Sequence, residues 1–163
     1  MRILIISDTH RRNENLFRIL DIIEKPDMII HCGDVEGSEY TISECVDCPV
    51  EMVAGNNDFF SDLPREREFM IGDYRIWLTH GHTYYVSMGN EIIKQEAAVK
   101  GVDIVMYGHT HRPVIDTEGE VIAINPGSLA YPRQEGRKAS YIIMELDENG
   151  EAQFALHYLK DES

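Results

Sequence analysis

Residues 3–10 read Ile-Leu-Ile-Ile-Ser-Asp-Thr-His, an unbroken apolar run that turns abruptly polar. Four consecutive apolar residues are typical of a short strand that is buried on both faces, as in a parallel sheet covered by helices. Ligand sites in open α/β sheets form beyond the carboxyl ends of the strands. The polar residues that follow Ile6 are therefore candidates for a functional site.

The chain then alternates between helical and strand-like patterns. Apolar residues recur at helical spacing over 16–23, after a candidate cap at Asn13. A strand at 28–30, a short helix at 40–46 and a strand at 50–53 follow. This β-α-β-α-β order favours a parallel sheet with right-handed crossovers.

The remainder of the chain changes character. Two strands flank a turn at Gly72-Asp73, and a helix over 91–100 is ended by Gly101. The strands expected in this part are 68–71, 74–78, 103–107, 113–116, 121–124, 139–145 and 153–159. The pattern predicts mixed sheets with helices outside them, in a single α/β domain that spans residues 1–163.

Composition and charge narrow the class of protein. Lys plus Arg is 15 and Asp plus Glu is 29, which gives a net charge of −14. This balance disfavours binding of nucleic acid and favours cationic partners, including metal ions. No run reaches the ~18 apolar residues of a membrane span, so no membrane partner is expected.

The three cysteines are too few for a disulfide framework, so we expect a reducing, cytoplasmic setting. Cys45 and Cys48 have the spacing of a zinc or redox pair. Because no second pair accompanies them, we interpret them as ordinary thiols.

Potential metal ligands follow five successive strands. The motifs are Asp8-Thr9-His10, Gly33-Asp34, Gly55-Asn56-Asn57-Asp58, His80-Gly81-His82 and Gly108-His109-Thr110-His111. Any one of them can arise by chance, and solvated loops explain Asp and Asn easily. Solvated loops do not explain why four of the candidate ligands, His10, His80, His109 and His111, are histidines. The neighbouring glycines allow tight turns and close approach. The set therefore indicates a metal site at one sheet edge.

These motifs match the calcineurin-like metallophosphoesterases in order and rough spacing, over residues 3–128. The short length and the segment Asn125-Pro126-Gly127-Ser128 most resemble the small phosphodiesterases of bacteria and archaea. The resemblance implies an α/β fold, a four-layer α/β/β/α sandwich of two mixed β-sheets flanked by helices. It also implies two metal ions. One would be held by Asp8, His10 and His111, the other by Asn56, His80 and His109, with Asp34 between them.

The implied activity is hydrolysis of a small phosphodiester by a hydroxide that bridges two divalent ions. Nitrogen and oxygen ligands suit transition metals, and we expect manganese before nickel, iron, cobalt or zinc. Asp34 and Asn56 would then serve catalysis as well as metal binding. Asp58 is expected to orient a ligand or a water molecule by hydrogen bonding.

One position departs from the resemblance. Many relatives carry a histidine where this chain has Asn57, and an amide cannot protonate a leaving group. We expect His82 to donate that proton. Arg112 would meet a phosphate oxygen or pair with a surface carboxylate.

Other functions remain open at this point. A phosphomonoesterase would use the same metal ligands, and the retromer subunit of this fold serves as a protein-binding scaffold. A nuclease is disfavoured because the chain lacks a basic surface. Homo-oligomers are left open, and Phe59-Phe60 is expected in the core rather than at a contact surface.

Overall fold

Two five-stranded sheets form the body of the protein. The structure is a computed structural model that describes residues 1–160. The first sheet has the order β10 (Ala152–Tyr158), β9 (Ser140–Leu146), β1 (Arg2–Ile6), β2 (Met28–His31) and β3 (Val50–Met52). The second has the order β4 (Glu66–Ile71), β5 (Tyr74–Thr79), β6 (Ile104–Met106), β8 (Ile122–Pro126) and β7 (Pro113–Asp116). Both sheets contain parallel and antiparallel pairs.

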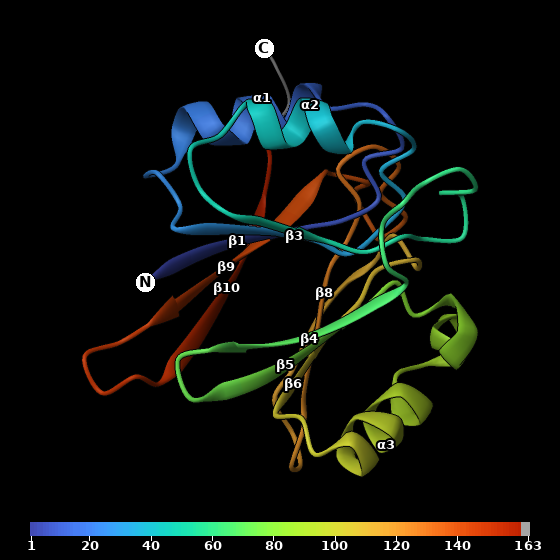
Figure 1. Cartoon of the computed structure of the whole chain (residues 1–163), viewed down its shortest axis with the longest axis vertical. Helices are drawn as coiled ribbons and strands as arrows, with labels where there is room; N and C mark the ends of the chain where they lie inside the picture. Colours follow the sequence, from blue (N-terminus) through green and yellow to red (C-terminus); the bar gives the residue numbers. More distant parts are fainter. Residues whose placement is uncertain (161–163) are drawn as a thin grey trace.

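Helices cover the outer face of each sheet. The helices α1 (Glu14–Ile22) and α2 (Glu39–Glu44) lie over the first sheet, and α3 (Glu91–Lys100) lies by the second (Figure 1). This arrangement confirms the four-layer α/β/β/α sandwich of two mixed sheets. The extent of the predicted single domain stays a prediction, and its last residues, 161–163, lie outside the described residues.

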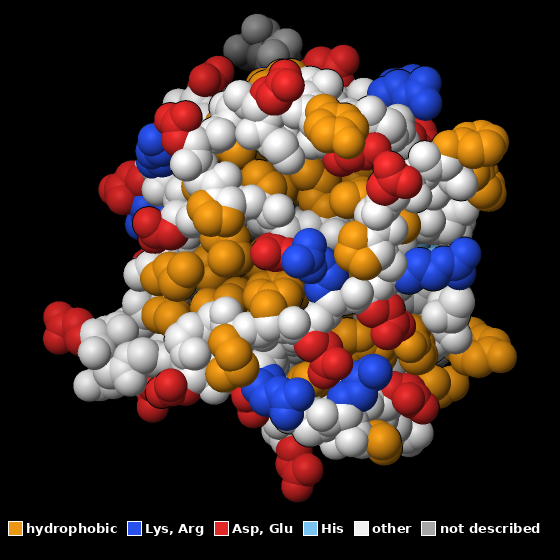
Figure 2. Space-filling model, viewed as in Figure 1, with side chains coloured by type: hydrophobic (Ala, Val, Ile, Leu, Met, Phe, Trp, Pro, Cys, Tyr) orange, Lys and Arg blue, Asp and Glu red, His pale blue; other side chains and the backbone are white. Residues whose placement is uncertain are grey.

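The strand β1 explains why its sequence is continuously apolar. Ile3 and Ile5 point into the core between the sheets, whereas Leu4 and Ile6 point into the core beneath α1 and α2. All four side chains are completely buried. A third core, around Trp77, packs between the second sheet and α3. Figure 2 shows that further apolar side chains reach the surface between the β9–β10 and β4–β5 hairpins.

The strand directions concentrate loops at one edge of the sandwich. β1, β2 and β3 are parallel in one sheet, as are β5, β6 and β8 in the other. Their carboxyl ends face the same side, where loops from both sheets gather at the right of Figure 1. All five ligand motifs lie in these loops.

Several local expectations need correction. Asn13 stands at the start of α1, but its side chain makes no capping hydrogen bond; its carbonyl accepts from the Phe17 amide instead. Phe59 and Phe60 are 79% and 103% exposed, so their predicted burial is wrong. The preceding Asp58 turns inward to bind backbone amides, and the chain then leaves the sheet edge. Two short 3₁₀ turns, His82–Tyr84 and Val86–Met88, were not expected before α3.

The cysteines are free thiols: Cys32 is buried, Cys48 is half-buried and Cys45 is exposed. No helix in residues 1–160 is both long and apolar enough to cross a membrane.

His31 ends β2 and ties two of the ligand-bearing loops together. Its Nδ1 accepts from the Gly33 amide at 3.1 Å, so the neutral ring carries its proton on Nε2, which donates to Thr9 Oγ1 at 2.9 Å. Burial lowers the pKa of His31 to about 4, against 6.5 for a free imidazole. The ring therefore stays neutral in the folded protein at neutral pH.

This burial predicts a pH-dependent stability. Between pH 6.5 and 4 the unfolded chain binds a proton at His31 that the folded chain excludes, so stability falls as the pH falls. The expected contribution is about 1.4 kcal/mol per pH unit in this window. Urea unfolding of metal-free protein at pH 7 and pH 5 measures it. His31→Asn should be less stable at pH 7 but lose less stability on acidification; an unchanged pH dependence would contradict the assignment.

Candidate metal centre

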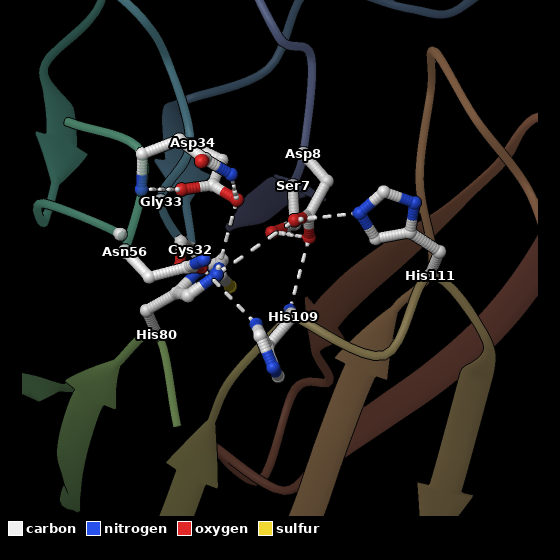
Figure 3. A network of polar contacts seen from close by, with 12 residues as sticks. Ser7, Asp8, Cys32, Gly33, Asp34, Asn56, His80, His109 and His111 are labelled. Atoms are coloured by element: carbon white, nitrogen blue, oxygen red, sulfur yellow. Dashed lines mark hydrogen bonds and ion pairs between the residues drawn. The ribbon is translucent and has the colours of Figure 1, made fainter. Parts of the chain in front are cut away.

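The loops at the crowded edge bring the predicted ligand side chains into one cluster. Figure 3 shows Asp8 and Asp34, from the first sheet, facing His80, His109 and His111, from the second. Asp8 and His80 are completely buried, and Asp34 is 1% exposed. Buried carboxylates are costly unless they are paired or bind cations, so this cluster requires a chemical explanation.

One group of three side chains surrounds Asp8. The Asp8 Oδ1 atom lies 3.2 Å from His111 Nε2 and 3.7 Å from His10 Nε2. The two histidine Nε2 atoms are 3.2 Å apart. Oxygen and nitrogen atoms that converge at such distances can share a single cation.

A second group adjoins the first and shares Asp8. His80 Nε2 lies 3.4 Å from Asp34 Oδ2 and 3.8 Å from Asp8 Oδ1. Asp34 Oδ2 is also 3.7 Å from His10 Nε2, so this oxygen lies between the two groups. The remaining pair, Asn56 and His109, meets through Oδ1 and Nδ1 at 3.1 Å. Five of the seven predicted ligands thus converge in these two groups, and the pair lies beside them, with the His109 ring centroid 5.2 Å from that of His80.

Hydrogen bonds fix which nitrogen of each histidine faces the cluster. His80 Nδ1 donates to the Cys32 carbonyl at 2.8 Å, and His111 Nδ1 donates to the Tyr131 carbonyl at 2.7 Å. His10 Nδ1 lies 3.2 Å from the Glu36 carboxylate. With Nδ1 held by these partners, Nε2 of each of the three rings faces the cluster and can bind a cation in exchange for any proton that it carries.

Two buried atoms in the cluster have no hydrogen-bond partner within residues 1–160. They are Asp8 Oδ1 and His80 Nε2. Each can donate a lone pair, and each points toward the middle of the cluster. Buried polar atoms rarely remain unsatisfied in folded proteins. A divalent cation would satisfy both, so these residues fit a metal site.

The electrostatics of the cluster also favour a cation. Burial alone raises the pKa of Asp8, but contacts with His10 and His111 outweigh it and hold the pKa well below its usual range. Burial lowers the pKa of His10, but Asp8 and Glu36 outweigh it and raise the pKa to about 9. The carboxylates thus stay ionised and attract positive charge.

The backbone adopts rare conformations to place these side chains. Asp8, His10, Asp34, His109 and His111 have φ angles between +46° and +71°. Side-chain-bearing residues seldom occupy this left-handed region, and strained residues cluster at functional sites.

Close approach is needed at Gly108. A Cβ atom there would lie 2.1 Å from Ser7 Oγ and 2.6 Å from Asp8 Oδ2. Gly55 is similarly confined, with Asp34 Oδ1 2.2 Å from the position of an added Cβ atom. The glycines beside the motifs therefore let the loops approach the carboxylates.

Asp58 and Asn57 contact the loop and side chain of Asp34. The Asp58 carboxylate accepts from the backbone amides of Asp34, Glu36 and Gly55. Asn57 donates to both oxygens of Asp34, from its amide at 2.9 Å and its side chain at 3.0 Å. Asn57 thus holds the Asp34 carboxylate in place. The sequence indicates only that Asn57 cannot act as an acid, and it does not predict this positioning role.

His82 and Arg112 lie at the margin of the cluster. His82 is half-buried, and its ring centroid is 5.5 Å from that of His80. It lines a cavity of about 210 Å³ with Asn56 and Arg65. Arg112 follows His111 directly and is exposed.

Sequence reasoning missed two side chains that support the cluster. Ser7 donates to Asp8 Oδ2 at 2.6 Å, and Glu36 contacts His10. Both lie within two residues of a predicted ligand, but hydroxyl and carboxyl groups are common in loops. Their positions in the sequence near a predicted ligand therefore do not predict these contacts.

Known proteins with similar sequences include phosphoesterases and probable phosphoesterases. The family model for the calcineurin-like phosphoesterase superfamily domain matches residues 1–149. A protein of Methanocaldococcus jannaschii named as a probable metallophosphoesterase is 37% identical over 136 residues, which cover 82% of this chain and 70% of that protein. A phosphodiesterase of the same organism is 32% identical over 146 residues, which cover 78% of this chain and 83% of the relative.

A solved structure shows the same fold with low sequence identity. Wild-type Vps29 of Entamoeba histolytica, complexed with zinc, superposes with a TM-score of 0.76 and 22% identity. The match covers 97% of this chain and 99% of Vps29. At this identity the likeness concerns the fold alone.

The close approach at Gly108 generates a prediction. Gly108→Ala should push the loop away from Asp8 and weaken binding of added Mn²⁺ or Zn²⁺ by at least about tenfold, because it displaces His109 and Asp8 together. Calorimetric titration of metal-free protein measures the affinity, and circular dichroism checks folding.

Gly119→Ala is the matched control. Gly119 has a φ of +75° but no atom within 4 Å of an added Cβ. It should lose stability through backbone strain yet keep its metal affinity. Equal loss of affinity in both variants would contradict the proposed crowding at Gly108.

Proposed function

The chain belongs to the calcineurin-like phosphoesterase superfamily, and we propose that it is a metal-dependent phosphodiesterase that acts on small phosphodiesters. One observation carries the proposal: two adjacent ligand groups share the buried Asp8 carboxylate, and lone pairs without partners point between them. Two neighbouring divalent ions are a recurring device for phosphoryl transfer.

The family resemblance implies which residues would hold which ion. Asp8, His10 and His111 would hold one ion, and Asn56, His80 and His109 the other, with Asp34 shared between them. When bound, the ions would activate water and neutralise charge on the phosphate in the transition state. Because the donors are imidazole, carboxylate and amide groups, we favour manganese, with nickel, iron, cobalt or zinc as alternatives.

The remaining residues of the site would position the Asp34 carboxylate and protonate the leaving group. Asn57 fixes both carboxylate oxygens of Asp34, and Asp58 fixes the backbone of the same loop. The Asp34 carboxylate and its loop therefore need no rearrangement during the reaction. His82 is our choice for the proton donor to the leaving oxygen. Its Nδ1 is buried without a hydrogen-bond partner in residues 1–160, and its ring borders the cavity beside Asn56.

The proposal also covers the cellular location, the substrate partner and the oligomeric state of the protein. Free thiols at Cys32, Cys45 and Cys48 support a reducing, cytoplasmic location. The net charge of −14 supports a small phosphoester as partner rather than nucleic acid. A homo-oligomer stays a prediction, which light scattering of the purified protein tests.

The first test compares two esters. Metal-stripped protein, supplied singly with Mn, Ni, Zn or Mg, is assayed on bis-p-nitrophenyl phosphate and on p-nitrophenyl phosphate. We expect hydrolysis of the diester to need added metal and to exceed that of the monoester at least about tenfold. The reverse preference would indicate a phosphomonoesterase. Binding of two ions without turnover of either ester would favour a scaffold, as in the retromer subunit.

A second test addresses His82. His82→Ala should slow diesters with poor leaving groups by about 10²–10⁴-fold, because these need protonation in the transition state, and slow p-nitrophenyl esters much less. His157→Ala is the control, since His157 is exposed on β10 and stacks on Tyr141, away from the ligand loops. Equal slowing across a series of aryl esters would remove His82 from this role.

A further inference from the structure

A cavity of about 600 Å³ adjoins the candidate metal centre. The loop that carries His109 and His111 forms one wall, because Thr110, between the two histidines, and Arg112 both line the cavity. The turn at 86–89 and the start of α3 form another wall. The residues with polar side chains that line it are Ser87, Asn90, Tyr107, Thr110, Arg112 and Arg133.

Two arginines line this cavity without acidic partners. Within residues 1–160, carboxylates form ion pairs with Arg2, Lys25, Arg67, Arg75 and Lys94. Neither Arg112 nor Arg133 has a carboxylate within ion-pair distance in this part of the chain. In a chain with 29 acidic and 15 basic residues, two guanidinium groups without acidic partners on one cavity form a locally positive region.

The backbone holds both arginines close to the metal ligands. The Arg133 amide donates to the His111 carbonyl at 2.9 Å. The Arg112 amide donates to Thr110 Oγ1 at 3.2 Å, and Asn125 Nδ2 donates to the same oxygen at 2.9 Å. The backbones of the two arginines are thus tied to the loop that carries His109 and His111.

The nearby acid does not cancel this positive charge. Asp116 meets Asn90 at the cavity wall, where Asn90 Nδ2 donates to Asp116 Oδ2 at 2.8 Å. The same oxygen accepts from Lys94 Nζ at 3.1 Å. Asp116 is therefore neutralised by Lys94, which leaves the cavity cationic. The cavity also offers the hydroxyl groups of Ser87 and the buried Tyr107.

We propose that this cavity binds a second phosphate group of the substrate while the scissile diester lies at the metal centre. The inference rests on the proposed function and narrows its substrate class to diesters that also carry a phosphomonoester group. Guanidinium groups bind phosphate through paired, charge-assisted hydrogen bonds, and hydroxyl groups can supply further donors to the remaining oxygens. Arg112 thus has a phosphate partner in place of the surface carboxylate considered from the sequence.

A matched pair of substrates tests the proposal. Thymidine 5′-(p-nitrophenyl phosphate) is compared with the same ester carrying a 3′-phosphate, using manganese-loaded full-length protein. We expect kcat/KM to be at least about tenfold higher for the phosphorylated ester, which corresponds to about 1.4 kcal/mol. Arg112→Ala combined with Arg133→Ala should reduce this ratio to near one. Arg75→Ala, which removes a positive charge elsewhere on β5, should keep it.

The outcomes separate this inference from the proposed function. If bis-p-nitrophenyl phosphate is hydrolysed but the 3′-phosphate gives no preference, or the double variant keeps the preference, the cavity proposal is overturned and the phosphodiesterase proposal stands.

If no ester is hydrolysed, calorimetric binding of inorganic phosphate to metal-free protein decides the matter. Saturable binding that the double variant loses would support the cavity as a phosphate site. Binding that is absent, or unchanged in the double variant, would overturn it.

Discussion

The buried carboxylate of Asp8 is the constraint on which the rest of the site depends. It lies where the two sheets meet, completely excluded from water, with one oxygen left without a hydrogen bond in the described chain. Removing such a charge from water costs several kcal/mol unless opposite charge compensates for it. Histidines from both sheets supply part of that compensation, and a divalent cation would complete it. The two sheets are thus joined at this edge by electrostatics as well as by the apolar core.

The backbone around this charge adopts strained conformations that place the ligand side chains. Asp8, Asp34 and His111 all adopt left-handed conformations that residues with side chains disfavour. Strain of this kind persists only where the surroundings hold it. Here Asp58 and Asn57 hold the loop of Asp34 by hydrogen bonds to its backbone and its carboxylate. Ligand atoms fixed before a cation arrives need little rearrangement when it binds, which is how preorganised sites lower the barrier to reaction.

The charge distribution over the whole protein also bears on how an anionic substrate would bind. The chain carries a net charge of −14, which opposes the approach of an anionic substrate. Positive charge would be concentrated where it is used: bound cations would supply it in the candidate metal centre, and Arg112 and Arg133 supply it in the adjoining cavity. Because both regions share the loop around Thr110, a substrate with two phosphate groups would bridge them. The fold shared with Vps29 supplies the scaffold, and these local charges would supply the chemistry.

Local sequence patterns predicted mixed sheets with outer helices and the candidate ligands, because these depend on neighbouring residues, and the family resemblance implied the four-layer sandwich. Continuous apolar runs such as Ile3–Ile6 mark strands that are buried on both faces, and polar residues directly after them mark the strand ends. The tertiary structure alone decided the contacts between distant loops. It paired Glu36 with His10 and hydrogen-bonded Asn57 to Asp34. It also placed Arg112 and Arg133 on one cavity and left Phe59 and Phe60 exposed. The physical reason is that spacing along the chain fixes the local conformation and the face of a strand, whereas contacts between loops depend on how two separate sheets pack.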